Sequence, residues 1–269
     1  MAAAYGVREV GGKGAGVRVG VLDTGLGARH PAFRRVVERT NWTPEGMVDD
    51  VVGHGTFVAS IVAGGLPRCP GMAPDAAVYA FRVFTSAQSS YTSWLLDALN
   101  YGLAKALHVV TLSVGGPDIS DAPFEDKLAE VAAAGTLVVS AIGNEGPLAG
   151  TPYSPADLLG VVGVGAASRD GAHVAPFSSR GPTLAEPAGR AAVGVARVKP
   201  DLLAHGVALA GAAIDGTCRI MSGTSVAAPV VAGAAAVLLS LAAAGSDSAT
   251  SGYVSDAARS LAAARVMAA

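Results

Sequence analysis

Short apolar runs recur along the chain, and each ends close to a polar or small residue. The runs are rich in Val, Leu and Ile, and a length of about four to eight residues is typical of strands buried on both faces. They cover residues 17–22, 78–84, 109–114, 137–142 and 159–164. We expect these segments to form the inner strands of one sheet.

Between these runs, apolar residues follow a helical period. Segments 54–63, 92–107 and 124–134 have this spacing, as Leu95, Leu99 and Leu103 illustrate. Alternation of buried strands with helices predicts an α/β fold, with a mostly parallel central sheet and helices on both faces. Functional groups of such folds gather where a strand ends or the next helix begins. No shift in composition divides the chain, so we expect a single domain over residues 1–269.

Residues 226–245 form the longest apolar segment, which is rich in Ala and Gly and carries Pro229 near its start. Its length would suffice to cross a bilayer. A helix at the centre of a large core is also apolar on all sides, because it is buried on all sides. We interpret the segment as such a core helix.

Composition excludes several classes of protein. Hydrophobic residues make up 51% of the chain and charged residues 15%, which suits a compact enzyme rather than a disordered chain. The net charge of −2 gives no basic surface for nucleic acid, so no nucleic-acid partner is expected. The two cysteines, Cys69 and Cys218, are too few for a disulfide framework or a zinc site. They can pair with each other or stay free, and the sequence leaves both states open.

Three residues lie where catalytic groups are expected. Asp23 directly follows the first apolar run, His54 stands between two glycines at a predicted helix start, and Ser225 begins the long apolar segment. Each alone has an ordinary structural explanation, such as a helix N-cap for the serine. The chain order Asp, His, Ser is nevertheless one of the orders known for a catalytic triad. No histidine follows Ser225, as the α/β-hydrolase order would require.

Asn144 follows the run at 137–142 and is a fourth candidate. Its side-chain amide can donate to an oxyanion, and loss of such a donor typically costs about 3–4 kcal/mol of transition-state stabilisation. An Asn before a turn is, taken alone, a common turn former. Together the four residues predict a triad of Asp23, His54 and Ser225, with Asn144 and the Ser225 N–H as the oxyanion hole.

The segments around these residues resemble the subtilase family of serine proteases. The matching motifs are DTG at Asp23, HGT at His54, GN at Asn144 and GTS-x-AAP at Ser225, with SVGGP, FSSRGP and KPDLLA elsewhere. The resemblance covers nearly the whole chain. It implies a subtilisin-like fold and a serine endopeptidase that hydrolyses polypeptide substrates through an acyl-enzyme.

Within this family, the chain resembles the site-1 protease branch. Stretches such as DDVVGHGTFVAS and CRIMSGTSVAAPVVAGA carry the resemblance. The branch implies processing of membrane-bound precursor proteins in the lumen of the secretory pathway, in the endoplasmic reticulum or Golgi. Two alternatives stay open: a general degradative subtilisin, and an inactive subtilase fold that binds without cleaving.

The family's enzymes are made with a signal peptide and an inhibitory propeptide, and the branch adds a membrane anchor. The sequence shows none of these segments. We therefore expect a peptidase domain that is a fragment without its propeptide and C-terminal portion. Contact with a membrane is expected only through segments outside this sequence.

The resemblance also implies how a peptide would bind. The residues expected to line the first subsite as extended backbone edges are Ser113, Val114, Gly115, Gly116, Ala141, Ile142 and Gly143. The peptide would dock on these edges by strand addition. Phe84 and Leu95 are expected as apolar walls of neighbouring subsites. An arginine four residues before the cut is the branch's preference, and Asp118, Asp121 or Glu125 could pair with it; solvated loop acids are the alternative.

No cofactor is expected to be required. A structural calcium ion stays open, because calcium is common in subtilases and acidic pairs such as Asp49–Asp50 occur. No contiguous oxygen-ligand loop of a recognisable kind is present in the sequence.

Overall fold

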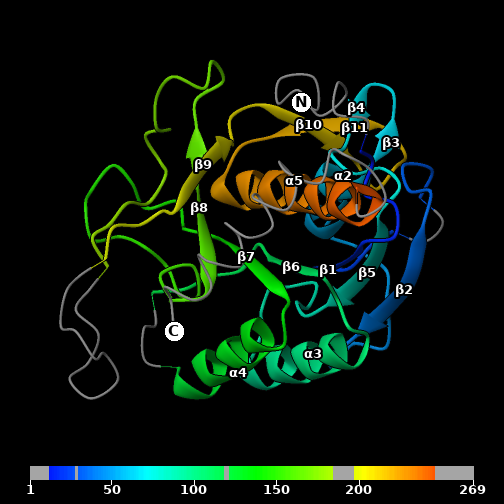
Figure 1. Cartoon of the computed structure of the whole chain (residues 1–269), viewed down its shortest axis with the longest axis horizontal. Coiled ribbons are helices and arrows are strands. Elements are labelled where there is room, and N and C mark those ends of the chain that lie inside the picture. Colours follow the sequence, from blue (N-terminus) through cyan, green and yellow to red (C-terminus); the bar gives the residue numbers. More distant parts are fainter. Residues whose placement is uncertain (1–11, 28–29, 118–120, 184–196, 246–269) are drawn as a thin grey trace.

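Seven strands form one sheet at the centre of the computed structural model, which describes residues 12–27, 30–117, 121–183 and 197–245 (Figure 1). Their order is β2-β5-β1-β6-β7-β8-β9, and all neighbouring pairs run parallel. The five predicted runs form the inner strands β1 (Arg18–Asp23), β5 (Ala77–Arg82), β6 (Val109–Leu112), β7 (Leu137–Ala141) and β8 (Val161–Ala167). The prediction of an α/β fold around a mostly parallel sheet is confirmed.

The sequence pattern does not predict the two edge strands, β2 (Val36–Asn41) and β9 (Leu202–His205). An edge strand has a neighbour on one side only and can carry polar residues, so it lacks the continuous apolar run of an inner strand. Val36 and Val37 of β2 are accordingly exposed. Two hairpins lie outside the main sheet and were also not predicted: β3 (Gly65–Leu66) with β4 (Cys69–Pro70), and β10 (Leu209–Ala212) with β11 (Cys218–Met221).

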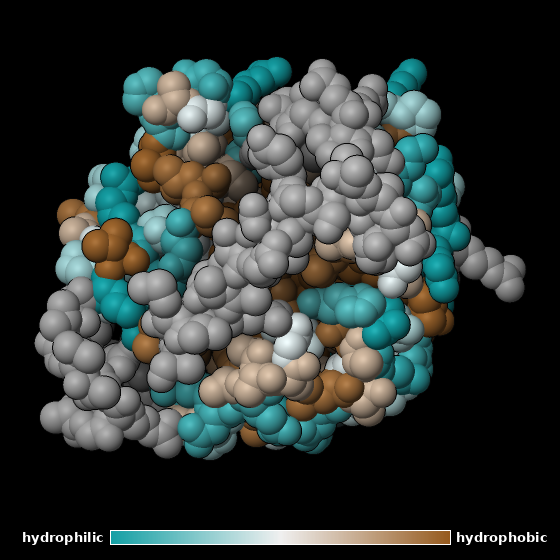
Figure 2. Space-filling view, in the orientation of Figure 1, coloured by the Kyte–Doolittle hydropathy of each residue, from teal (hydrophilic) through white to brown (hydrophobic). Residues whose placement is uncertain are grey.

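Helices cover both faces of the sheet, as predicted (Figure 1). Helices α2 (His54–Ala63) and α5 (Thr224–Gly245) pack on one face, and α3 (Thr92–Ala104) and α4 (Ala122–Ala133) pack on the other. Figure 2 shows hydrophilic residues along the lower edge of the molecule, below α3 and α4, with apolar residues among them. Each face of the sheet therefore has its own hydrophobic core.

Helix α5 is the one helix among the described residues that is long and apolar enough to cross a membrane. Of its apolar 18-residue stretch, 56% is buried inside the protein. Most of residues 224–237 are buried, which agrees with a core helix. The prediction that this helix is buried on all sides is wrong for its last turns, where Leu238 is 41% exposed. The helix has 22 residues and the longest strand beneath it has seven, so its end extends beyond the sheet.

The strand order reverses at β1. The chain leaves β1 for β2 and β5 on one side, and later crosses to β6 and β7 on the other. Such a topological switch point opens a crevice at the carboxyl ends of the strands, where α/β proteins bind ligands. Asp23 is the last residue of β1, so the fold places it at this point.

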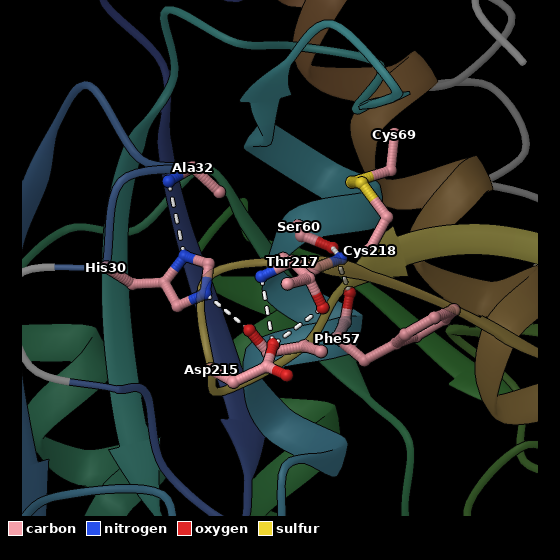
Figure 3. The surroundings of a disulfide bond; sticks show 10 residues. His30, Ala32, Phe57, Ser60, Cys69, Asp215, Thr217 and Cys218 are labelled. Atoms are coloured by element: carbon pink, nitrogen blue, oxygen red, sulfur yellow. Dashed lines mark hydrogen bonds between the residues drawn. A yellow bond between two sulfur atoms is a disulfide. The ribbon is translucent and has the colours of Figure 1, made fainter.

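Figure 3 shows how the β10–β11 hairpin is fastened to helix α2 and the loop after β1. Cys218 of β11 forms a disulfide with Cys69 of β4, with Cα atoms 6.1 Å apart. The Ala212 N–H donates to Ser60 Oγ at 2.7 Å, and the His30 ring bonds a carbonyl of the hairpin turn at 2.6 Å. The sequence left the state of the cysteines open, and the structure pairs them. The disulfide and these two hydrogen bonds hold the hairpin in place, and the chain continues from it into α5.

Candidate active site

The structure brings Asp23, His54 and Ser225 into one hydrogen-bonded chain. His54 Nδ1 lies 2.8 Å from Asp23 Oδ1 and 2.9 Å from Oδ2, and His54 Nε2 lies 3.2 Å from Ser225 Oγ. A neutral imidazole that donates from Nδ1 to the carboxylate has Nε2 free as an acceptor for the serine hydroxyl. The three side chains come from the end of β1, the start of α2 and the start of α5.

The buried, negatively charged Asp23 carboxylate favours protonation of the His54 ring. Asp23 is 1% exposed, so little water screens its carboxylate. That negative charge raises the pKa of His54 above its ordinary value of 6.5, against the opposing effect of burial. The imidazolium form is therefore favoured once the ring has taken a proton.

Ser225 lies in the first turn of α5, four residues before Pro229. Proline has no N–H, so the regular helical donor to the Ser225 carbonyl is missing. The Ser113 hydroxyl, just after β6, donates to that carbonyl at 2.9 Å. The sequence indicated Ser113 only as backbone along the peptide. Its side chain also connects Ser225 to the sheet.

The amide of Asn144 has a fixed orientation. Asn144 Oδ1 accepts from the Thr224 N–H at 2.9 Å and from Thr224 Oγ1 at 3.1 Å, which leaves the Nδ2 donor turned the other way. A Cβ at Gly223 would lie 3.1 Å from Ser225 Oγ and 3.9 Å from Asn144 Nδ2. The hydroxyl and the amide therefore face a common small space that is open because residue 223 is glycine. That space suits an oxyanion formed next to Ser225.

The model of the subtilase family matches residues 14–267 of this chain. The chain belongs to the subtilase family. Among curated relatives of this subtilase, the human membrane-bound transcription factor site-1 protease is 52% identical over 232 residues, which are 86% of this chain and 22% of that relative. Subtilisin DY of Bacillus licheniformis is 33% identical over 238 residues, 87% of this chain and 80% of that one.

Solved structures agree with this family. Sphericase superimposes with a TM-score of 0.72 at 25% identity, over 85% of this chain and 78% of its own. A cold adapted subtilisin-like serine proteinase gives 0.68 at 28% identity, over 84% and 76% of the two chains. The subtilisin-like fold predicted from the motifs is confirmed. The subtilase spans about a fifth of the length of the site-1 proteases that it matches.

The two predicted backbone edges differ in what they can still bind. Ser113, Val114 and Gly115 make no backbone hydrogen bond to another described residue of the subtilase, so they remain available to a peptide strand. At Gly116 the edge ends, because its N–H and carbonyl are both bonded to Ser154, at 3.1 and 3.0 Å. A peptide strand can therefore pair with residues 113–115, whereas the prediction that it also pairs with Gly116 is wrong.

The second predicted edge, residues 141–143, is already occupied. Ala141 lies in the ladder between β7 and β8. The Ile142 N–H donates to Val164, and its carbonyl accepts from the Tyr153 N–H. Gly143 is likewise bonded through both of its backbone groups. These residues can form a wall of a subsite, but the prediction that they pair with a peptide is wrong.

The apolar walls and acidic candidates lie around α3 and α4. Leu95 is 8% exposed and Phe84 is partly buried, and both belong to the core under these helices, so Leu95 can offer only a small apolar surface. The Asp121 carboxylate caps α4 and accepts from Thr92 Oγ1, which uses much of its hydrogen-bonding capacity. Glu125 lies in the first turn of α4. Asp118 lies outside the described residues.

Within the described part of the chain, no group of three or more His, Cys, Asp or Glu side chains is placed to hold a metal ion. The Asp49–Asp50 pair does not form a carboxylate site either. Asp49 pairs with Arg39 at 2.5 Å, and both Asp50 oxygens accept hydrogen bonds from the protein. A structural calcium ion elsewhere in the chain stays a prediction.

Sequence reasoning gave three polar residues no part in this site, and considered one of them, Asp50, only as a possible calcium ligand. Asp50, Thr24 and Thr56 form a buried hydrogen-bonded group between Asp23 and His54. The available signal was the threonine in each of the DTG and HGT motifs. Neither threonine has a role in the chemistry, and so neither attracted a functional interpretation.

Proposed function

We propose that this subtilase is a serine endopeptidase that cleaves polypeptides through an Asp23–His54–Ser225 triad and an acyl-enzyme. The hydrogen-bonded chain from Asp23 to Ser225, ending beside the space shared with Asn144, supports this proposal most directly. The two cores on either side of one sheet support a single peptidase domain.

The geometry suggests a role for each group. Ser225 Oγ attacks the scissile carbonyl while His54 Nε2 takes its proton and later passes it to the leaving amine. Asp23 holds Nδ1–H and stabilises the imidazolium. Asn144 Nδ2 and the Ser225 N–H donate to the oxyanion. No step needs a cofactor; a structural calcium ion would reveal itself if activity were lost in a chelator and restored by calcium.

Replacement of Ser225 by Ala tests the proposal. The unmodified chain should be labelled by a fluorophosphonate and should cleave peptides, whereas Ser225→Ala should do neither. Ser93→Ala, a change at an exposed serine of α3, is the matched control and should keep both properties. Labelling that persists in Ser225→Ala would show that another residue is the nucleophile, and an unlabelled parent chain would favour a binding role.

For the substrate, we propose processing of membrane-bound precursor proteins, because the chain is similar to proteins named membrane-bound transcription factor site-1 protease. The 52% identity over 232 residues supports it. The Cys69–Cys218 disulfide supports an oxidising compartment such as the lumen of the secretory pathway. An inhibitory propeptide, and any membrane contact through segments outside this sequence, belong to the same proposal.

A peptide library separates this proposal from a degradative subtilisin. Site-1-like cleavage should require Arg four residues before the cut, whereas broad apolar preference would indicate general degradation. Asp121→Asn and Glu125→Gln should weaken the Arg preference if these acids bind it. An unchanged preference would exclude the pairing.

A further inference from the structure

Asp50 is a buried carboxylate that the triad mechanism does not use. It is 5% exposed and lies four residues before His54. Its Oδ1 accepts from Thr24 Oγ1 at 2.9 Å, Val52 N–H at 3.0 Å and Gly53 N–H at 2.7 Å. Its Oδ2 accepts from the N–H and the hydroxyl of Thr56, at 2.8 and 2.7 Å. Five donors are thus directed at one buried carboxylate.

The two threonines join this carboxylate to both sides of the site. Thr24 directly follows Asp23, and its Oγ1 also accepts from the Gly55 N–H at 2.9 Å. Thr56 belongs to α2, and its Oγ1 accepts from the Gly27 N–H, in the loop after β1, at 3.1 Å. The loop that carries Asp23 and the helix that carries His54 therefore share one hydrogen-bonded centre.

The start of α2 takes its side-chain acceptors from Asp50 and Thr24, because its own N-cap residue gives no side-chain hydrogen bond. Its N-cap residue is Gly53, and no acidic residue lies in the first turn. Helix N-termini present unpaired N–H groups and attract negative charge, and Asp50 supplies both the acceptors and the charge. The helix also touches the loop directly: a Cβ at Gly55 would lie 2.2 Å from the Gly25 carbonyl oxygen. Little space separates the two elements, so their relative position depends on the hydrogen bonds across it.

We propose that Asp50 is a positioning residue, which sets the distance between the Asp23 carboxylate and the His54 ring through Thr24 and Thr56. The inference rests on the proposed function of the same site. A displacement of about 1 Å in a catalytic group can cost on the order of 100-fold in rate. A merely structural Asp50 would affect the folded fraction, and not the turnover of each folded molecule.

Charge gives an independent readout. The charged groups that act on the His54 ring are Asp23 and Asp50, which raise its pKa, and Arg219, which lowers it. Arg219 lies close by, since its Nη1 would be 3.1 Å from a Cβ at Gly53. Neutralising Asp50 should therefore lower the pKa of His54 and move the acid limb of kcat/KM to lower pH. Arg219→Gln should move the limb to higher pH.

The experiment compares variants of this 269-residue chain by kcat per active site, with sites counted by fluorophosphonate titration. Asp50→Asn, Thr24→Val and Thr56→Val are expected to lower kcat by roughly 10- to 100-fold, with KM within about twofold. Thr24→Ser keeps the hydroxyl and should restore most of the rate. Thr136→Val is the matched control, because Thr136 is a buried threonine that donates at 2.8 Å to Leu107, on the far end of the sheet.

The outcomes separate the two proposals. Reduced kcat per titrated site in the Asp50 and threonine variants, with Thr136→Val unaffected and the acid limb of Asp50→Asn lowered, would support the positioning role. Unchanged kcat per site in all three variants would overturn it, even if they melt at lower temperature. If Asp50→Asn does not fold, the two Thr→Val variants decide alone. A parent chain without titratable sites would overturn the proposed function itself, and the positioning role with it.

Discussion

The Ser225 carbonyl offers a sharp test of how the nucleophile is held. Its regular helical donor would be the N–H of residue 229, which proline lacks, and Ser113 Oγ donates to it instead at 2.9 Å. Ser113→Ala removes that donor. Pro229→Ala restores an N–H at the helical position. The loss of stability caused by Ser113→Ala should therefore be smaller when Pro229→Ala is also present.

The magnitude follows from the hydrogen bond. Leaving a buried or partly buried carbonyl without its donor costs about 1–3 kcal/mol. Ser113→Ala should therefore lower the free energy of unfolding by about 1–2 kcal/mol while Pro229 is present, because the contact is only partly buried. In the Pro229→Ala background, the helix supplies a donor, and the cost of Ser113→Ala should fall below about 0.5 kcal/mol. The coupling energy should then be about 1 kcal/mol or more.

The assay is a double-mutant cycle in urea, followed by tryptophan fluorescence, with peptide hydrolysis measured on the same four proteins. The hydrolysis rate should show the same compensation, since the carbonyl belongs to the proposed nucleophile, Ser225. Ser140→Ala is the control partner, because Ser140 is buried and its hydroxyl donates at 3.2 Å to Leu112 of the neighbouring strand. If Ser113→Ala costs as much in the Pro229→Ala background as it does with the proline in place, the reasoning is refuted.

Three further predictions concern the triad, the oxyanion hole and the disulfide. Asn144→Ala should lower kcat by about 10²–10³-fold with little change in KM, as steady-state kinetics would show. Because Asp23 raises the pKa of His54 above 6.5, kcat/KM should rise with pH through a limb above 6.5. In Asp23→Asn that limb should move to lower pH while the rate falls, and an unmoved limb would contradict the assignment. Replacing Cys69 and Cys218 by Ser opens a loop spanning 149 residues, which should cost about 5 kcal/mol of unfolding free energy in the chain-entropy account. Denaturant titration measures this cost, and a cost below about 1 kcal/mol would contradict it.

Burial decided which parts of the fold the sequence predicted. Inner strands such as β1 and β7 need apolar residues on both faces, so their runs were visible. The edge strand β2 reads VVERTN, because one side of it faces water, and the two-residue strands β3 and β4 are too short for any period. These elements depend on contacts made after the sheet has formed, which no local pattern contains.

The candidate site divides in a similar way. Asp23, His54, Ser225 and Asn144 could be predicted because each stands in a short motif whose residue type the chemistry demands. The hydroxyl of Ser113 could not, since its bond to the Ser225 carbonyl joins residues 112 positions apart. Residues 141–143 were assigned an open edge because the family resemblance implied one. The resemblance could not show that backbone groups of Val164 and Tyr153 already bond to Ile142 in this edge.

Asp50 shows why an intact triad alone does not establish a working site. An acid beside another acid suggested a cation ligand, whereas in the fold its oxygens are taken by donors from both catalytic elements. The threonines of DTG and HGT meet at this carboxylate, so both motifs carry one residue for chemistry and one for its placement. A subtilase that kept Asp23, His54 and Ser225 but lost Asp50 would retain the groups for catalysis without the bonds that fix their distances. Asp50, Thr24 and Thr56 are all present in this chain, so the hydrogen bonds that would fix these distances accompany its triad.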